Sequence, residues 1–235
     1  MTGPSSILEG ADGFYAVYTD NLSAPVRLRE HLNTLGERWH FREGAVKARA
    51  CCHYIQPFLE CLEGLLSRGV DPEAIEAIHC EVPIGEETLI CEPWAEKLRP
   101  STAYQAKFSL PYALAALLLD GAVTVASFEG PARAQVCALA DIVTWSPMAD
   151  GDFPNRYGAR VTVTTRCNDR FTAEVKDVRG TPERPFSKDE ALRKFYDCAL
   201  PVLCDDAPER LAEAVEHLER VRNLAALTSA LRCVR

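Results

Sequence analysis

The segment from Gln105 to Leu119 constrains the fold most, because it is apolar at nearly every position after Lys107. It is shorter than the roughly 20 apolar residues that span a bilayer. Several alanines within it favour a helix that is buried on most sides, ended by Asp120 and Gly121. Such a helix needs other layers around it, and a chain of 235 residues with 47% hydrophobic residues can supply them.

Helices are predicted on both sides of this segment. Apolar residues spaced three and four apart predict a helix from Tyr54 to about Arg68, stopped by Gly69. A short helix is expected over 131–140. Ser187 followed by Glu190 forms the pattern of a capping box at the start of another helix. The region after Pro208 is amphipathic and is also predicted to be helical.

Strands are predicted from shorter alternating segments. IEAIHCEVP over 75–83 alternates in part like a half-buried strand, and TLICEP from Thr88 is expected to be another extended piece. The segments 161–165 and 171–175 predict a hairpin. The segment 39–50 is interpreted as a strand or an extended arm. Helices interleaved with short strands predict a layered α+β fold, and we expect a single domain over 1–235.

The charge and the cysteine pattern exclude several classes of protein. A net charge of -8 and a pI near 5.2 leave no broad basic surface, so we predict no binding to nucleic acid. Neither a signal peptide nor a membrane span is indicated, so we expect a cytoplasmic protein without membrane contact. The ten cysteines form no C-x-x-C pair, and we predict no bound metal.

The segment from Lys47 to Tyr54, KARACCHY, is the best candidate for chemistry. Lys47 stands just before a predicted helix N-terminus, whose amides and dipole attract anions. Arg49 and His53 would strengthen this attraction for a carboxylate. The competing interpretation is a solvated basic surface near a helix end, which is the more common case for such residues.

Three segments together resemble one known family. They are KARACCHYIQP from Lys47, AKFSLPYALAALLLDG from Ala106 and VRGTPERPFSKDEALRKFYDCA from Val178. The chain resembles the C-terminal domain of the MmgE/PrpD family, which includes 2-methylcitrate dehydratase, cis-aconitate decarboxylase and iminodisuccinate epimerase. The resemblance implies the layered α+β fold of that domain. It also implies that the family's N-terminal all-helical domain is absent from this chain.

The resemblance assigns roles to residues at matching positions. Lys47 is expected to anchor a substrate carboxylate and to act in catalysis, while Cys52 stands where related decarboxylases carry a pocket histidine. His53 is the histidine with a cationic neighbourhood and is the third expected catalytic residue. The expected substrate-binding residues besides Lys47 are Arg49, Gln56, Lys107 and Tyr112. For Lys107 and Tyr112 a role in the core is the competing interpretation.

The resemblance also implies an activity. We expect a lyase or isomerase that acts on a small di- or tricarboxylate by dehydration, decarboxylation or epimerisation, with no cofactor. Removal of a proton next to a carboxylate needs a base and several charge-stabilising groups. The family's helical half supplies the proton-transfer residues, so we expect the chain to need a helical partner half, either as a separate subunit or as part of a longer chain. A homo-oligomer, such as a dimer, is expected as well.

Two alternatives remain open at this point. The chain is either such an enzyme domain or a non-catalytic remnant that keeps the fold as a carboxylate-binding or dimerisation module. A third class is an unrelated thiol-dependent enzyme that uses Cys51 or Cys52, activated by His53.

Overall fold

The computed structural model describes residues 6–8, 10–11, 13–19, 21 and 23–232. Backbone contacts divide the chain into two compact units, Met1–Gly44 and Ala45–Arg235. The first unit contains α1 (Phe14–Thr19), α2 (Ala24–Leu32) and the 3-10 helix η1 (His40–Glu43), and no residue of these three helices is buried. The single domain over 1–235 stays a prediction.

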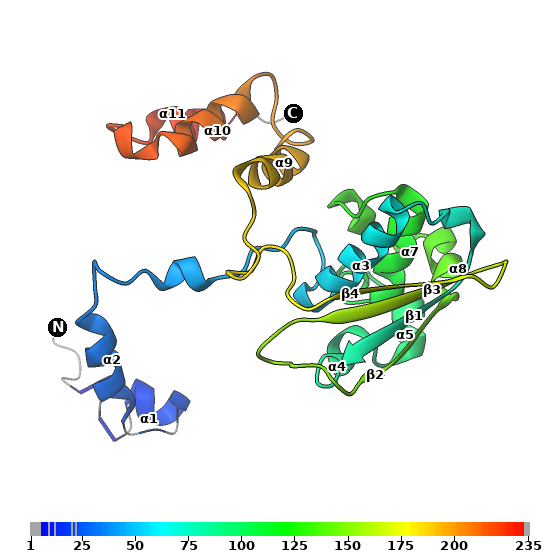
Figure 1. Ribbon diagram of the computed structural model, residues 1–235. Helices are drawn as coiled ribbons and strands as arrows, with labels where there is room; N and C mark the ends of the chain where they lie inside the picture. The colour runs from blue at the N-terminus through cyan, green and yellow to red at the C-terminus, as the bar shows by residue number, and fades with distance from the viewer. Residues whose placement is uncertain (1–5, 9, 12, 20, 22, 233–235) are drawn as a thin grey trace. The chain divides into compact units, whose positions relative to one another are not determined.

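The second unit is built around a mixed sheet of four strands in the order β2-β1-β3-β4 (Figure 1). The strands are β1 (Ile75–Pro83), β2 (Val143–Met148), β3 (Ala159–Thr165) and β4 (Arg170–Val175). β1 pairs in parallel with β2 and antiparallel with β3, and β3 continues into β4 through a hairpin. This arrangement confirms the predicted α+β fold.

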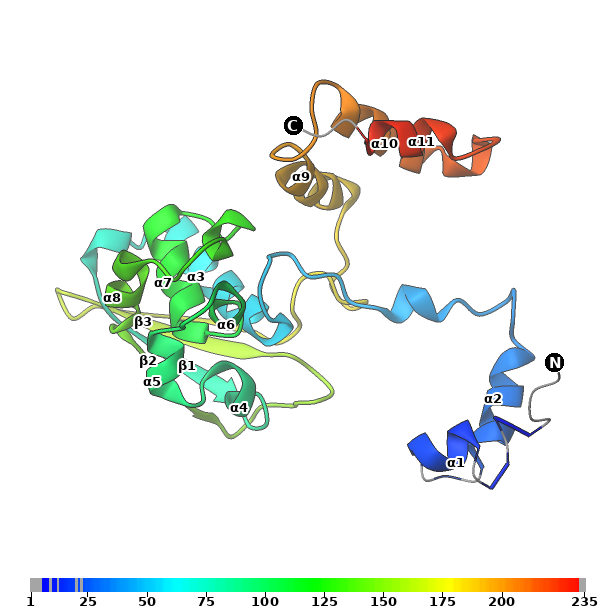
Figure 2. The same ribbon diagram turned by 180° about the vertical axis from the view of Figure 1, so that it is seen from behind.

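Helices α3 (Gln56–Ser67), α7 (Leu110–Asp120) and α8 (Ala134–Ala140) lie beside the sheet and cover one of its faces (Figures 1 and 2). Alternate residues of the central strands point toward them and are fully buried: Ile78, Cys80, Val82, Val161 and Val163. Every residue of α7 from Leu110 to Leu117 is buried, as expected for a helix that is apolar on all sides.

Hydroxyl and imidazole groups form hydrogen bonds across the other face of the sheet. The Nδ1 of His79 lies 3.0 Å from Thr144 Oγ1, and its Nε2 lies 2.9 Å from Ser146 Oγ. The hydroxyls of Thr162 and Thr172 are 2.9 Å apart. These polar side chains need no apolar cover, so a single layer of helices suffices for the sheet.

Several predicted elements are confirmed. β1 has the predicted bounds, α3 falls within the predicted helix, and the hairpin joins β3 to β4. Gly69 after α3 and Gly121 after α7 have φ values of +95° and +74°, the left-handed conformation that ends helices. The capping box is present at α9 (Lys188–Ala199), where the Ser187 hydroxyl accepts a hydrogen bond from the Glu190 amide.

Other predictions were wrong. The segment from Thr88, expected to be extended, begins inside the short helix α4 (Glu87–Ile90), because a turn at 84–86 precedes it. For the segment 39–50 the strand alternative was wrong, since its first part is the 3-10 helix η1, whereas the rest is an arm without strand pairing, as the other alternative predicted. Strand β2 was not predicted, because its exposed Thr144 and Pro147 interrupt the apolar pattern. Proline is tolerated there since β2 is an edge strand.

The long apolar segment from Gln105 to Leu119 is two helices. α6 (Ala103–Ala106) ends before Ser109, and α7 begins at Leu110. Ser109 is the N-cap of α7: its hydroxyl accepts a hydrogen bond from the Tyr112 amide at 3.1 Å. The capping bond explains the break inside an otherwise continuous apolar run.

The remaining elements are short or C-terminal. The amphipathic C-terminal region is divided into helices α10 (Ala207–Glu216) and α11 (Ala225–Ala230). They share a small apolar cluster with α9 that includes Ala199, Leu203 and Leu211. No helix in the described part of the chain is long and apolar enough to cross a membrane. The other elements are η2 (His53–Ile55), η3 (Pro72–Ala74), α5 (Trp94–Leu98), η4 (Ala126–Phe128) and η5 (Leu218–Arg220).

Gly180 holds two distant segments together, and its substitution should destabilise the fold. Its φ is +96°, its carbonyl accepts a hydrogen bond from the Val46 amide, and an added Cβ would lie 2.2 Å from the Val46 oxygen. We expect Gly180→Ala to lower the free energy of unfolding by about 1–3 kcal/mol. Gly64→Ala in α3 is the matched control. No heavy atom lies within 4 Å of its Cβ position.

Urea unfolding of both variants checks this prediction. Gly64→Ala should raise the free energy of unfolding by about 0.5–1 kcal/mol, since alanine favours a helix interior over glycine. Equal effects of the two substitutions would contradict the proposed role of Gly180.

Candidate functional site

The loop before α3 is held by one buried side chain, Gln56, which is 1% exposed. The Gln56 Oε1 accepts a hydrogen bond from the Arg49 amide at 2.9 Å, and its Nε2 donates to the Arg49 carbonyl at 3.1 Å. The Nε2 also lies 3.3 Å from the Cys52 carbonyl oxygen. The Cys52 amide in turn donates to the Lys107 carbonyl at 2.8 Å. The path of the loop over 49–52 is therefore fixed from inside the protein.

This loop brings together the three residues predicted to be catalytic. Lys47 is exposed, His53 is half-buried and Cys52 is buried. Burial raises the pKa of the Cys52 thiol, and the nearby Lys47 ammonium opposes this shift only in part. Burial lowers the pKa of His53, and the positive charge of Lys47 lowers it further. At neutral pH the site therefore holds a cation, a neutral imidazole and a protonated thiol.

Aromatic side chains enclose this end of α3. Tyr157 stacks on Tyr54 with ring centroids 5.5 Å apart and meets the His53 ring edge-on at 5.0 Å. Phe153 lies edge-on to Tyr54 at 5.4 Å. Phe153 and Tyr157 come from the loop between β2 and β3. The Tyr157 ring packs against the imidazole, and the buried Nε2 of His53 has no hydrogen-bond partner.

Glu86 is a member of this site that the sequence did not indicate. It lies in the turn after β1 and is 0% exposed, and neither of its carboxylate oxygens has a hydrogen-bond partner. Burial, with a smaller contribution from Glu87, raises the pKa of Glu86 to about 8. Its charge acts on both the Cys52 thiol and the Tyr54 hydroxyl. A glutamate in an Ile-Gly-Glu-Glu turn is usually solvated, so no sequence pattern marked it.

A second ammonium group also lies near Cys52. Lys97 of α5 donates hydrogen bonds from its Nζ to the Leu89 carbonyl at 2.5 Å and to the Phe108 carbonyl at 3.0 Å. Burial lowers the pKa of Lys97, and the interaction with Cys52 is among those that oppose the shift. Lys97 joins α5 to two neighbouring segments and adds positive charge to the surroundings of the thiol.

The predicted substrate-binding residues are already engaged with other groups. The Arg49 guanidinium pairs with Glu63 of α3, and the Gln56 amide is bonded to the loop. Lys107 contributes its backbone carbonyl to Cys52, while its side chain is half-buried. Tyr112 is 1% exposed, and its hydroxyl accepts a hydrogen bond from the Arg133 amide at 3.2 Å. Direct contact of these four side chains with a substrate stays a prediction.

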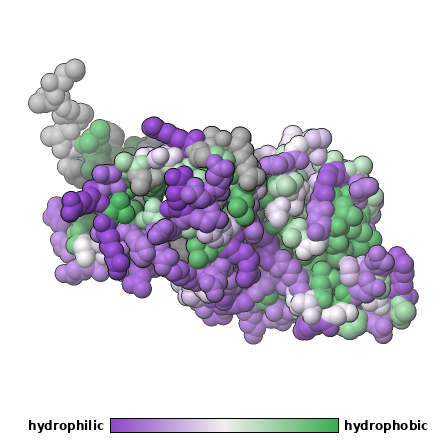
Figure 3. Space-filling model, turned by 90° about the horizontal axis from the view of Figure 1, so that it is seen from above, coloured by the Kyte–Doolittle hydropathy of each residue, from purple (hydrophilic) through white to green (hydrophobic). Residues whose placement is uncertain are grey.

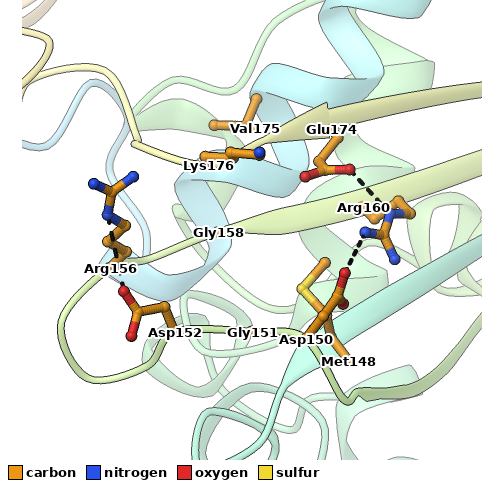
Figure 4. A pocket seen from close by; sticks show the side chains of 10 residues that line it. All are labelled: Met148, Asp150, Gly151, Asp152, Arg156, Gly158, Arg160, Glu174, Val175 and Lys176. Atoms are coloured by element: carbon orange, nitrogen blue, oxygen red, sulfur yellow. Dashed lines mark hydrogen bonds and ion pairs between the residues drawn. The ribbon is translucent and has the colours of Figure 1, made fainter.

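A neighbouring pocket of about 280 Å³ shows how the loop between β2 and β3 is held (Figure 4). Arg160 of β3 bonds to Asp150 at 3.0 Å, Glu81 at 2.6 Å and Glu174 at 3.2 Å. Arg156 bonds to Asp177 at 3.3 Å. These pairs fasten both ends of the loop that carries Phe153 and Tyr157, so the pocket is interpreted as structural support.

The described residues contain no group of three or more histidine, cysteine, aspartate or glutamate side chains that could hold a metal ion. The absence of any cofactor stays a prediction. The chemistry available at the start of α3 is that of an ammonium group, an imidazole and a buried carboxyl group.

The fold and this basic helix start define a layered α+β domain with a candidate anion site. Residues 50–220 match the MmgE/PrpD C-terminal domain. The chain belongs to the MmgE/PrpD family, as the sequence resemblance predicted.

Individual relatives give the same result. A cis-aconitate decarboxylase-like protein, oryM, from Aspergillus oryzae is 29% identical over 92% of this chain and 46% of its own length. The cis-aconitate decarboxylase of Aspergillus terreus is 24% identical over 94% of this chain and 47% of its own. The cis-aconitate decarboxylase of Mus musculus is 31% identical over 57% of this chain and 28% of its own length. The chain spans about half the length of the first two relatives, or less.

Removal of the Gln56 amide tests whether this residue mainly supports the loop. We expect Gln56→Ala to lower the free energy of unfolding by about 2–4 kcal/mol, because backbone groups of 49–52 lose their partners inside the protein. Gln135→Ala, at an exposed position of α8, should change it by less than about 0.5 kcal/mol. Thermal or urea unfolding measures both. Unchanged stability with weakened carboxylate binding would instead support a direct substrate contact.

The buried Glu86 should make stability depend on pH. Its pKa is raised from 4.5 to about 8 on folding, so between these values the folded state binds more protons than the unfolded state. Its contribution to stability therefore falls as the pH rises from about 4.5 to about 8, by at most about 1.4 kcal/mol per pH unit. Glu86→Gln should become progressively more stable than the wild type over this range. A pH-independent difference in urea unfolding would contradict the raised pKa.

Proposed function

We propose that this chain forms the carboxylate-binding half of a lyase or isomerase that acts on a small di- or tricarboxylate. The observation that carries the proposal is the exposed Lys47 ammonium in the loop that leads to α3, close enough to His53 for its charge to lower the pKa of that residue. An anionic oxygen is the natural partner of an exposed ammonium group.

The names of the relatives suggest a substrate. Cis-aconitate, the substrate named for the relatives from Aspergillus terreus and Mus musculus, is a small tricarboxylate. A tricarboxylate offers one carboxylate to Lys47 while the carbon that reacts stays a few ångströms away. Decarboxylation is therefore the first reaction to test, with dehydration and epimerisation as the other candidates.

The described residues include groups to bind charge, but none of the candidates near Lys47 is a well-placed base. His53 is neutral and could accept a proton, but its Nε2 is buried behind Tyr157. Cys52 is protonated and buried, which disfavours both a basic and a nucleophilic thiolate. The same burial raises the pKa of Cys51 to about 12, which argues against the thiol-dependent alternative. We therefore propose that a second, helical half completes the site.

Exposed apolar side chains support a partner surface. Leu89 is 41% exposed and Tyr104 is 70% exposed, and both line a pocket of about 490 Å³ beside α4 and α6. Ile84, two residues before Glu86, is 62% exposed. Figure 3 shows hydrophobic side chains that reach the surface among hydrophilic ones. A helical subunit or a second copy of the chain could cover them, and a dimer remains part of the proposal.

A non-catalytic remnant is the second candidate function, and Cys52 favours it. The resemblance places a histidine at this position in related decarboxylases, whereas a buried thiol with a raised pKa cannot replace its acid-base chemistry at neutral pH. A remnant would still bind a carboxylate at Lys47. Turnover, not binding, separates the two candidates. A cytoplasmic location remains a proposal for both.

Calorimetric titration with cis-aconitate, citrate and 2-methylcitrate tests the proposed site. We expect the wild-type chain to bind at least one of them in the millimolar range, and Lys47→Ala to weaken this binding tenfold or more, because the charge that anchors a carboxylate is lost. Lys188→Ala is the control. It removes an exposed lysine on α9 that pairs with Glu216.

Three results would contradict parts of the proposal. Absence of binding at millimolar concentrations would contradict a retained half-site, and equal weakening by both substitutions would contradict the assignment to Lys47. Release of carbon dioxide from cis-aconitate by the chain alone would contradict the need for a second half.

A further inference from the structure

Glu86 is the buried titratable group that the proposed chemistry does not yet use. It follows β1, in the turn that leads into α4, and is 0% exposed. The preceding Gly85 has a φ of +104°, and an added Cβ there would lie 2.9 Å from two ring atoms of Phe153. This close approach shows that the turn packs against the Phe153 ring, one of the aromatic side chains near the start of α3.

In the described part of the chain, burial and the charge of Glu87 are what shift the pKa of Glu86, and no cation is among the causes. The Lys97 ammonium acts on Cys52 and Cys91 in the same region, but its Nζ is bonded to the Leu89 and Phe108 carbonyls. The titratable groups that interact with Glu86 are the neighbouring Glu87 in α4, Cys52 and Tyr54 before α3, and Cys91 after α4. Each of these four groups is neutral when protonated and negative when deprotonated. A carboxylate among them would be a buried, unpaired anion, so the neutral acid is the favoured form.

Two buried polar groups of the site, on His53 and Glu86, lack hydrogen-bond partners. The atoms concerned are the His53 Nε2 and both oxygens of the Glu86 carboxyl group. Tyr54 interacts with Glu86 through charge and stacks on Tyr157, whose ring meets His53. Buried polar groups without partners are rare in folded proteins, and two in one place indicate a functional constraint.

We propose that Glu86 is the proton-holding residue of this site, which carries a proton in the free protein and retains it more strongly when an anion binds beside Lys47. The inference rests on the proposed carboxylate site and extends it. An anion bound beside Lys47 adds negative charge near Glu86 and so disfavours the carboxylate form of this residue. The protonated form of Glu86 is therefore favoured further. The proton comes from solvent, and no other bond is formed or broken.

The first test follows the free protein and needs no binding partner. Glutamate labelled with ¹³C at Cδ is observed by NMR as the pH is raised, and the signal missing from Glu86→Gln identifies residue 86. We expect this carbon to titrate near pH 8, far above the value of about 4.3 usual for a solvent-exposed glutamate. Titration of the Glu86 carbon near that usual value would overturn the proposal.

The second test measures protons taken up on binding. Cis-aconitate is titrated into the protein at pH 8 in two buffers of different ionisation enthalpy, because the difference in heat gives the number of protons bound. We expect uptake of roughly half a proton at most. His53 should contribute little at this pH, since its pKa lies below 6.5. Glu86→Gln should still bind cis-aconitate but without uptake, while Glu129→Gln should behave like the wild type.

The outcomes separate this inference from the proposed function. Equal proton uptake by the wild type and Glu86→Gln, or no uptake by the wild type, would overturn the role of Glu86 and leave the carboxylate site intact. No binding by the wild type would overturn the proposed function and the coupling to it. In that case, the titration of the Glu86 Cδ still decides whether the residue holds a proton.

Discussion

The buried amide of Gln56 is the interaction on which the candidate site depends. The loop over 49–52 has no regular secondary structure, so its backbone groups need partners that neither a helix nor a sheet provides. One side chain at the first turn of α3 supplies several of them at once. Lys47, Cys52 and His53 take their places from that loop. The residue that looked like a substrate contact is thus the one that makes the site possible.

Burial and charge oppose each other at the start of α3. The exposed Lys47 ammonium attracts negative charge, whereas burial disfavours the charged forms of Cys52 and Glu86. An exposed cation therefore lies near buried groups that stay neutral.

The sequence predicted those parts of the fold that local periodicity determines. β1, α3, the β3–β4 hairpin and the cap at Ser187 each follow from spacing or from a turn residue. β2 was missed because an edge strand with Thr144 and Pro147 lacks a clear alternation. Lys47, Cys52 and His53 were selected as candidates because they lie close together in the chain. Glu86 was missed since only the fold brings a turn after β1 beside a loop that precedes it by more than thirty residues.

The bond between the Val46 amide and the Gly180 carbonyl has an architectural consequence. It joins the start of the segment that enters the sheet and helix core to the end of the segment that leaves it. A core whose entrance and exit touch can be inserted into, or removed from, a longer chain with little disturbance to what flanks it. The domain is therefore suited to insertion into longer polypeptides and, for the same reason, to circular permutation.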